Sequence, residues 1–262
     1  MSILDVTRVF QYDYIIVDAL LLVIWLIFVI NFKKWKALKV SVFFSLCVYF
    51  IDAIWWWNTP WGNVYIREYW FGVPEVAVQH PFDPTILLNL LKFGADFMMT
   101  ISYSLYAFTW LWIIFENIEK KDKKEVILFT CLFFGFWMVL PWISILIPLN
   151  DLPVHTVRHM DTQLIVWIVN VFIGYTILVV IYGTNLLKSK NPKIILYIFI
   201  IGCVESFFME FPLFISGIRP INFAFLLYEI FFLFNQGAPY LFVIYDKIFS
   251  FLINKKEKIH KE

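Results

Sequence analysis

The chain has 262 residues, of which 61% are hydrophobic and 21% aromatic, and its mean hydropathy is +0.77. These values exclude a water-soluble globular core and indicate a protein whose solvent is mostly lipid. The formal net charge of +1 by itself says nothing about nucleic acid. No nucleic-acid partner is predicted, because the basic residues flank apolar stretches, where they set orientation and meet the heads of membrane lipids.

Seven apolar stretches follow one another along the chain, and each is long enough, at about 1.5 Å per residue, to cross a hydrocarbon layer of roughly 30 Å. They cover about residues 15–32, 38–57, 85–115, 125–147, 162–187, 193–216 and 221–246. We therefore predict an all-α fold, a polytopic integral membrane bundle of seven transmembrane helices that forms a single domain over residues 1–262.

The basic residues are distributed unevenly between the two sides of the predicted membrane. Sixteen of the 17 lysines lie in four clusters at alternate ends of the spans, around residues 33–39, 120–124, 188–193 and 247–261. The four arginines, Arg8, Arg67, Arg158 and Arg219, lie at the opposite ends. Because lysine-rich connections face the cytoplasm, we expect a multi-pass membrane protein with its N-terminus outside, its C-terminus in the cytoplasm and no cleaved signal peptide.

The connections on the cytoplasmic side are predicted to be short, whereas the outer side carries two longer segments, residues 58–84 and 148–161. Tryptophan and tyrosine side chains gather between residues 55 and 70, where the second span leaves the membrane. Because amphipathic rings favour the headgroup level, we interpret this segment as an aromatic belt with a partly embedded loop. A lid over the entrance for a lipid or another ligand is the alternative.

Two of the predicted spans carry carboxyl groups on recognisable polar faces. Asp52 ends a stripe on the second span that also contains Ser41, Ser45 and Tyr49. The third span carries Asn89, Lys92 and Asp96 at spacings of three and four residues. Such spacing predicts that Lys92 and Asp96 pair on one face.

The last three spans also carry polar side chains. Glu205 and Glu210 are five residues apart on the sixth span and hence roughly 140° apart around a helix. The other polar groups are Asn170 on the fifth span and Glu229, Asn235 and Gln236 on the seventh. Counting at about 1.5 Å per residue places Asp52, Glu210, Glu229 and Asn170 roughly 8 to 13 Å below the outer surface, and Asp96 at roughly 17 Å. A shared depth favours a cavity that opens outward; hydrogen bonding between helices is the alternative.

Metal and cofactor sites are not predicted. His155 and His159 are four residues apart and, on a helix, would bind a metal together with Asp161 or His80. That set lacks the base of a HExxH motif, and a solvated, pH-sensitive loop is favoured. The sequence has no Walker motif, GxSxG motif, CxxC motif or glycine-rich phosphate loop, so we expect no cofactor. Asn235 and Gln236 lie where a retinal protein carries its lysine, which disfavours a photoreceptor.

Two short segments resemble the small seven-span membrane-bound terpene cyclases of meroterpenoid pathways. The first is the basic turn NFKKWKALK at residues 31–39, which leads into the span that ends with Asp52. The second is NQGAPYLFVIY at residues 235–245, where Gln236 stands at the position of the family's second acid. Ile51 also replaces the tryptophan that precedes the first acid in the family. The resemblance implies that Asp52 protonates an isoprenoid epoxide or stabilises the resulting cation. Because the amide of Gln236 cannot act as an acid, Glu229 would have to serve as the second acid.

We therefore expect an integral-membrane enzyme that acts on a hydrophobic lipid or isoprenoid substrate by acid catalysis in an outward-opening cavity. The expected catalytic residues are Asp52, Asp96, Glu210 and Glu229. The expected substrate-binding residues are Lys92, Asn89, Asn170, Glu205, Asn235 and Gln236. A transporter would use the same ionisable groups as a path for ions or protons, and a receptor-like protein would use the cavity for a ligand.

Overall fold

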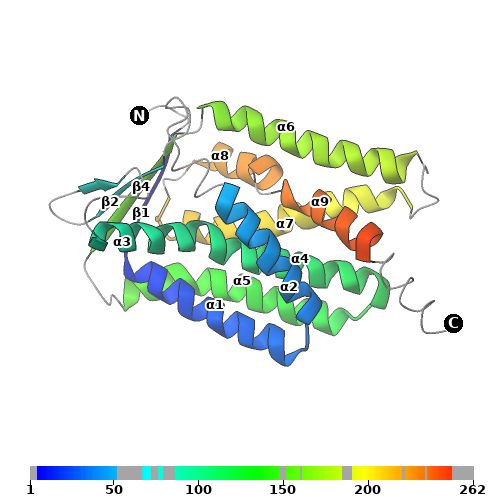
Figure 1. Cartoon of the computed structure of the whole chain (residues 1–262), viewed down its shortest axis with the longest axis horizontal. Coiled ribbons are helices and arrows are strands. Elements are labelled where there is room, and N and C mark those ends of the chain that lie inside the picture. Colours follow the sequence, from blue (N-terminus) through cyan, green and yellow to red (C-terminus); the bar gives the residue numbers. More distant parts are fainter. Residues whose placement is uncertain are drawn as a thin grey trace.

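The structure is a computed structural model that describes residues 5–51, 67–71, 76–78, 86–147, 152–159, 161–184, 191–219, 222–233 and 235–249. Most of these residues belong to long helices that lie alongside one another, and four strands gather at one end of the helical bundle (Figure 1). We call this end the sheet end. The opposite end, where the lysine-rich connections of the bundle lie, is called the lysine end.

The helices occur in the order that hydropathy predicts. In the first half they are α1 (Asp13–Asn31), α2 (Trp35–Val48), α3 (Ile86–Asp96), α4 (Tyr103–Lys120) and α5 (Lys123–Leu146). In the second half they are α6 (Asp161–Leu178), α7 (Lys193–Ile215), α8 (Phe223–Tyr228) and α9 (Gly237–Val243). Wider π-helical segments continue or join several of them, at Phe97–Ser102, Val179–Gly183, Glu229–Leu233 and Ile244–Phe249.

Among the described residues, six helical stretches are long and apolar enough to cross a membrane, which indicates a multi-pass membrane protein. They are Asp13–Asn31, Ile86–Ile118, Lys123–Leu146, Ile165–Gly183, Lys193–Ile215 and Phe223–Lys247. These six stretches coincide with six of the predicted spans, which are therefore confirmed as helices of sufficient length and apolar character. The remaining span, predicted over residues 38–57, is helical from Trp35 through Ile51, and the rest of it lies outside the described residues.

Large apolar side chains on the outside of the bundle fit a lipid surrounding. Leu20, Phe43 and Phe172 are each more than half exposed. A water-soluble protein rarely exposes so many large apolar side chains. Inside the bundle, the ring of Trp25 is fully buried and meets Phe129 edge-on, at 5.6 Å between ring centroids. Aromatic contacts of this kind continue from α1 across α4 and α5 to α7 and hold these helices together.

The all-α prediction needs one correction, because a four-stranded antiparallel sheet closes one end of the bundle. Its strands are β1 (Asp5–Gln11), β2 (Arg67–Phe71), β3 (Val76–Val78) and β4 (Pro153–His159), and their order in the sheet is β1-β4-β2-β3. The N-terminal segment, for which no secondary structure was predicted, and both of the long connections, predicted as loops, therefore contribute strands. In the register of the sheet, Arg8 lies opposite Thr156, and Thr156 lies opposite Tyr69.

The segments of the sheet contain β-branched and aromatic residues, which are enriched in strands. The sheet forms where these segments, although distant in sequence, pair with one another. β4 has the sequence PVHTVRH, in which three of the seven residues are β-branched, and it pairs along its length with β1. Two backbone hydrogen bonds then join the sheet region to the bundle: Val9 N–H donates to the Ile218 carbonyl at 3.0 Å, and Tyr12 N–H donates to the Leu152 carbonyl at 2.9 Å. The sheet is therefore fixed directly above the ends of α1 and α7.

Candidate functional site

Four charged side chains meet beneath the sheet and form what we call the ion-pair cluster: Arg8, Glu210, Arg219 and Glu229. Arg219 contacts Glu229 through two nitrogens, with Nη1 at 2.5 Å from Oε2 and Nη2 at 2.7 Å from Oε1. Nη1 of Arg219 also contacts Oε2 of Glu210, whose other oxygen lies 3.3 Å from Nη2 of Arg8. Each of the four residues is less than 9% exposed. The two arginines and two glutamates balance each other in charge.

The local fold brings these residues together from separate parts of the chain. Arg8 lies on β1, and Glu210 lies near the end of α7. Gly217 follows α7 with a φ of 78°, a left-handed conformation that glycine adopts without strain. The chain turns back there, so that Arg219 reaches Glu210 nine residues earlier. Glu229 begins the π-helical segment after α8, and such segments often occur at functional sites.

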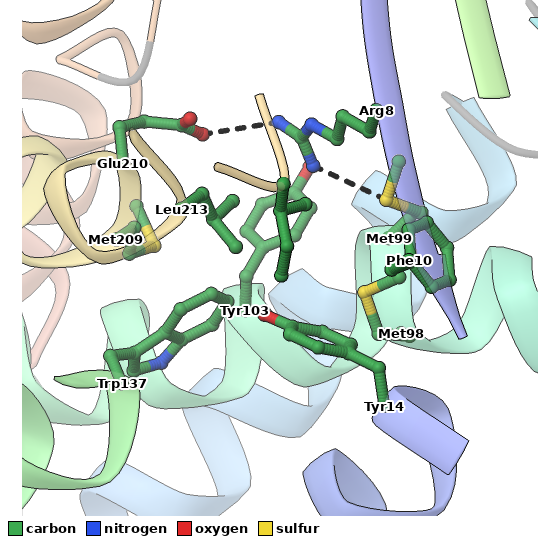
Figure 2. A pocket seen from close by; sticks show the side chains of 11 residues that line it. Arg8, Phe10, Tyr14, Met98, Met99, Tyr103, Trp137, Met209, Glu210 and Leu213 are labelled. Atoms are coloured by element: carbon green, nitrogen blue, oxygen red, sulfur yellow. Dashed lines mark hydrogen bonds and ion pairs between the residues drawn. The ribbon is translucent and has the colours of Figure 1, made fainter. Parts of the chain in front are cut away.

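A small cavity lies against this cluster, and we call it the sheet-end cavity. Its lining residues are Arg8, Phe10, Tyr14, Met98, Met99, Tyr103, Trp137, Met209, Glu210, Leu213 and Ile218. Figure 2 shows the Arg8–Glu210 pair on one side of this space and the rings of Tyr14 and Trp137 on the other. The volume of about 20 Å³ has room for a single water-sized molecule.

Two residues of the cavity wall carry a buried polar atom that lacks a hydrogen-bond partner among the described residues. The atoms are the hydroxyl of Tyr14 and Nε1 of Trp137. Buried polar groups are usually satisfied, so a water or a ligand is the natural partner for such atoms. The other lining side chains are mostly aromatic rings and methionines. The cavity therefore combines an apolar wall with a few polar groups, which is the usual composition of a small-molecule site.

Asp18 lies behind Tyr14 and was missed in the interpretation of the sequence. It is four residues after Tyr14 on α1, so the two side chains share one helical face and interact electrostatically. Oδ1 of Asp18 accepts a hydrogen bond of 2.7 Å from the Ser102 hydroxyl, and Oδ2 has no partner among the described residues. An acid inside the first apolar stretch was the signal that could have revealed this site.

The predicted pair on α3 is confirmed and forms a separate site. Nζ of Lys92 lies 3.1 Å from Oδ2 of Asp96, and both side chains are 1% exposed. Asn89 lies one turn earlier on the same helix. None of the three residues lines the sheet-end cavity. Asp52, the predicted catalytic residue of the second span, lies outside the described residues.

A third polar region, which we call the polar seam, lies between α6, α7 and α9. On its first side, Nδ2 of Asn170 donates to Oε1 of Gln236 at 2.6 Å. The hydroxyl of Tyr240 donates to Oδ1 of Asn170 at 2.7 Å. The predicted residues Asn170 and Gln236 thus meet each other, as interhelical hydrogen bonding predicts.

Asn235 and Glu205 occupy the other side of the polar seam. The Tyr175 hydroxyl donates to Oδ1 of Asn235 at 2.6 Å, and Nδ2 of Asn235 donates to the Phe199 carbonyl at 3.2 Å. Gly202 allows this close packing, because a Cβ there would lie 2.0 Å from Oδ1 of Asn235. Glu205 is 3% exposed and interacts electrostatically with Tyr175, but no ion pair engages it within the described residues.

The structure therefore distributes the predicted residues among three sites rather than one. Glu210 and Glu229 join the ion-pair cluster, Lys92 and Asp96 pair on α3, and the amides meet in the polar seam. Glu205 and Glu210 face different neighbours, as their spacing on one helix requires. The role of Arg8 and Arg219 was missed, because both were interpreted only as residues at the outer ends of spans.

The histidines lie in a different setting from the one that would support a metal site. His155 and His159 both belong to β4, a strand. Residues four apart on a strand are separated by roughly 13 Å, so the spacing that would join them on a helix does not apply. Among the described residues, no group of three or more histidine, cysteine, aspartate or glutamate side chains is arranged to hold a metal ion.

Comparison of the sequence with protein-family models and with curated proteins, and comparison of the fold with solved structures, finds no match. The function has to be inferred from the chemistry of the sites themselves.

We expect the Arg219→Gln substitution to destabilise the protein by about 3–5 kcal/mol, because it leaves two buried carboxylates without their shared cation. The measurement is the free energy of unfolding in detergent by denaturant titration. Lys120→Gln is the matched control, because its partner is Glu116 and Lys120 is exposed to 60%. An exposed pair contributes about 0–1 kcal/mol. Equal losses in the two variants would contradict the assigned role of the cluster.

Proposed function

We propose that the protein is an integral-membrane enzyme that acts on an apolar lipid or isoprenoid substrate at the sheet end of the bundle. The observation that supports this proposal is the sheet-end cavity, with its aromatic and methionine wall, its ion pair and the unpartnered Tyr14 hydroxyl. Aromatic faces stabilise the positive charge that develops when an isoprenoid substrate is protonated. A site enclosed by apolar side chains also keeps water away from such an intermediate.

The substrate has to enlarge the cavity when it binds. A volume of about 20 Å³ is far below the roughly 300–1,000 Å³ of typical small-molecule sites. Three of the lining side chains are methionines, Met98, Met99 and Met209. Methionine has three rotatable side-chain bonds and adapts to ligands of different shapes. These side chains are the parts of the wall that would move first.

The best-placed acid in this proposal is Asp18, which shares a helical face with Tyr14, a residue of the cavity wall. Because neither the Tyr14 hydroxyl nor Oδ2 of Asp18 has a hydrogen-bond partner among the described residues, one water between them would carry the proton from Asp18 toward the substrate. Acid catalysis near neutral pH uses carboxyl groups that are kept away from water and from cations. Asp18 is 1% exposed and forms no ion pair with a described residue. By contrast, Arg219 engages both oxygens of Glu229, and such a bidentate pair requires a carboxylate. Asp52 remains a predicted second acid on the resemblance to terpene cyclases.

The proposal includes the full topology: seven spans, with the sheet outside the membrane and the lysine end in the cytoplasm. The supporting observation is that the helix ends that carry the described lysines, at the α1–α2 and α4–α5 connections and the start of α7, lie opposite the sheet (Figure 1). Positively charged connections are retained on the cytoplasmic side during insertion. A membrane-dissolved substrate would then approach the cavity from the outer leaflet.

Reporter fusions in a bacterial host test this topology. We expect alkaline phosphatase fused after Glu262 to be inactive, because the lysine end faces the cytoplasm. The same reporter fused after Ile147, at the sheet end of α5, is expected to be active. An active fusion at the C-terminus combined with an inactive one after Ile147 would reverse the proposed orientation.

Mass spectrometry of lipid extracts tests the enzymatic proposal. Cells that express the wild type and are supplied with an isoprenoid epoxide are expected to form a new product. Because a general acid contributes about 10²- to 10⁴-fold to a rate, Asp18→Asn should lower product formation at least to that extent. Asp246→Asn is the matched control, since Asp246 is also buried but bonds to Tyr182 on α6's extension, away from the cavity.

The outcomes of this experiment separate the parts of the proposal. Full product formation by Asp18→Asn, at matched amounts of folded protein, would rule out Asp18 as the acid. Loss of product only in Asp52→Asn would assign that role to Asp52. No product from the folded wild type would argue against the enzyme and favour the second candidate function.

The second candidate is a transporter, and the position of Glu205 favours it. Glu205 lies near the middle of α7 and has no cationic partner among the described residues. Asp246 and Tyr182 carry the polar groups on toward the lysine end, with 2.7 Å between the hydroxyl and Oδ2. Ionisable groups at successive depths of a membrane protein often mark a path for protons or ions.

Reconstituted vesicles with an imposed pH gradient test the transport function. The wild type is expected to dissipate the gradient, as reported by a pH-sensitive dye, because Glu205 would accept and release protons. Glu205→Gln should abolish the flux, whereas Asp18→Asn should retain it. The enzymatic proposal predicts the opposite ranking of the two variants in product formation. A wild type without proton flux would exclude this form of transport.

A further inference from the structure

A larger groove lies at the other end of the bundle, and we call it the lysine-end groove. It has a volume of about 680 Å³ and is lined by Ile114, Asn117, Ile118, Lys121, Asp122, Lys123, Val126, Ile127, Lys193, Ile194 and Tyr197. These residues belong to the end of α4, the start of α5 and the start of α7, which lie together at the lysine end (Figure 1). The groove is therefore distinct from the sheet-end cavity.

The lining residues divide into a basic mouth and an apolar floor. Lys121, Lys123 and Lys193 are exposed, and none of them forms an ion pair with a described residue. Other lysines at this end are paired: Lys34 lies 2.5 Å from a glutamate, Glu125. The floor consists of isoleucine and valine side chains together with Tyr197. An unpaired positive charge above an apolar surface is complementary to an amphipathic anion.

The backbone adds to the positive potential of the groove. α5 begins at Lys123 and α7 begins at Lys193, so two long helices direct the positive ends of their dipoles toward it. The only carboxylate among the lining residues, Asp122, already accepts hydrogen bonds from the backbone N–H groups of Lys124 and Glu125, at 3.1 and 3.2 Å. Its charge is therefore used to cap α5.

One further polar atom points to a ligand. The side chain of Asn117 is buried, and its amide nitrogen donates to Glu125 at 2.8 Å. Its carbonyl oxygen Oδ1 is buried without a hydrogen-bond donor among the described residues. A hydroxyl group on a bound molecule would satisfy this oxygen, since buried acceptors are normally paired.

We propose that the lysine-end groove binds an anionic phospholipid with a hydroxyl-bearing headgroup. The phosphate lies against Lys121, Lys123 and Lys193, and the first part of an acyl chain covers the isoleucine floor. A membrane lipid is favoured over a soluble anion because the floor is apolar and the groove lies at the ends of membrane-spanning helices. A volume of 680 Å³ is suited to a headgroup and part of one chain rather than to a whole lipid.

Native mass spectrometry of the detergent-solubilised full chain tests this site, with phosphatidylglycerol, phosphatidylcholine and inorganic phosphate as separate probes. The groove variant combines Lys121→Gln, Lys123→Gln and Lys193→Gln. The control variant combines Lys33→Gln, Lys36→Gln and Lys39→Gln, which removes the same charge from exposed lysines at the same end, outside the groove. The melting temperature of each variant confirms that it is folded.

We expect the wild type and the control variant to retain phosphatidylglycerol in preference to phosphatidylcholine. In the groove variant, phosphatidylglycerol affinity should fall by about tenfold or more, because each lysine near an anionic lipid contributes to binding. Equal losses in the two variants would show a general charge effect and overturn the site. Equal binding of both lipids, or binding of inorganic phosphate with the affinity of the lipid, would overturn the assignment to an anionic lipid.

Discussion

The sheet end depends on the ion pairs that the guanidinium group of Arg219 forms with two buried glutamates. This group joins Glu210 of α7 to Glu229 of the segment after α8, and Glu210 in turn holds Arg8 of β1. A buried carboxylate without a partner is costly, so this arrangement ties the sheet, the turn after α7 and the last helical stretch to one another. The wall of the sheet-end cavity includes Arg8 and Glu210, so the shape of the cavity depends on the same contacts.

The buried ionisable groups fall into two classes, and the difference bears on function. The ion-pair cluster and the Lys92–Asp96 pair neutralise their own charge, which is what a structural role requires. Asp18 and Glu205 are as deeply buried, but neither has a cation among its described neighbours. Asp18 accepts a hydrogen bond from a hydroxyl group, and Glu205 has no hydrogen-bond donor among the described residues. The membrane penalises such groups, so their presence needs a chemical reason. Each of the two candidate functions uses one of them.

Features that depend on local sequence could be predicted, whereas features that depend on distant contacts could not. Hydropathy predicts the spans because each one is continuous, and a spacing of four residues predicts the Lys92–Asp96 pair because both residues lie on one helix. The sheet was missed because short strands such as β1 and β4 carry little periodic signal, and their partners lie about 150 residues away along the chain, as in the Arg8 and Thr156 pairing. Arg8 was missed as a partner of Glu210 for the same reason, because the two residues are 202 apart along the chain. Arg219 is only nine residues from Glu210, but the contact depends on the turn at Gly217, which helix spacing does not predict.

The positively charged side chains at the two ends of the bundle differ in burial and in pairing. At the sheet end, Arg8 and Arg219 are buried and each is paired with a carboxylate, and Arg8 also contacts the sulfur of Met99 at 3.2 Å, so these two side chains present no free positive charge to an anionic lipid. At the lysine end, the charges around the groove are exposed and have no carboxylate partner among the described residues. The proposed lipid site is therefore at the lysine end, where exposed lysines would attract an anionic headgroup. The substrate in the proposed function is uncharged and apolar, so its binding at the sheet end would depend instead on the aromatic and methionine wall of the cavity.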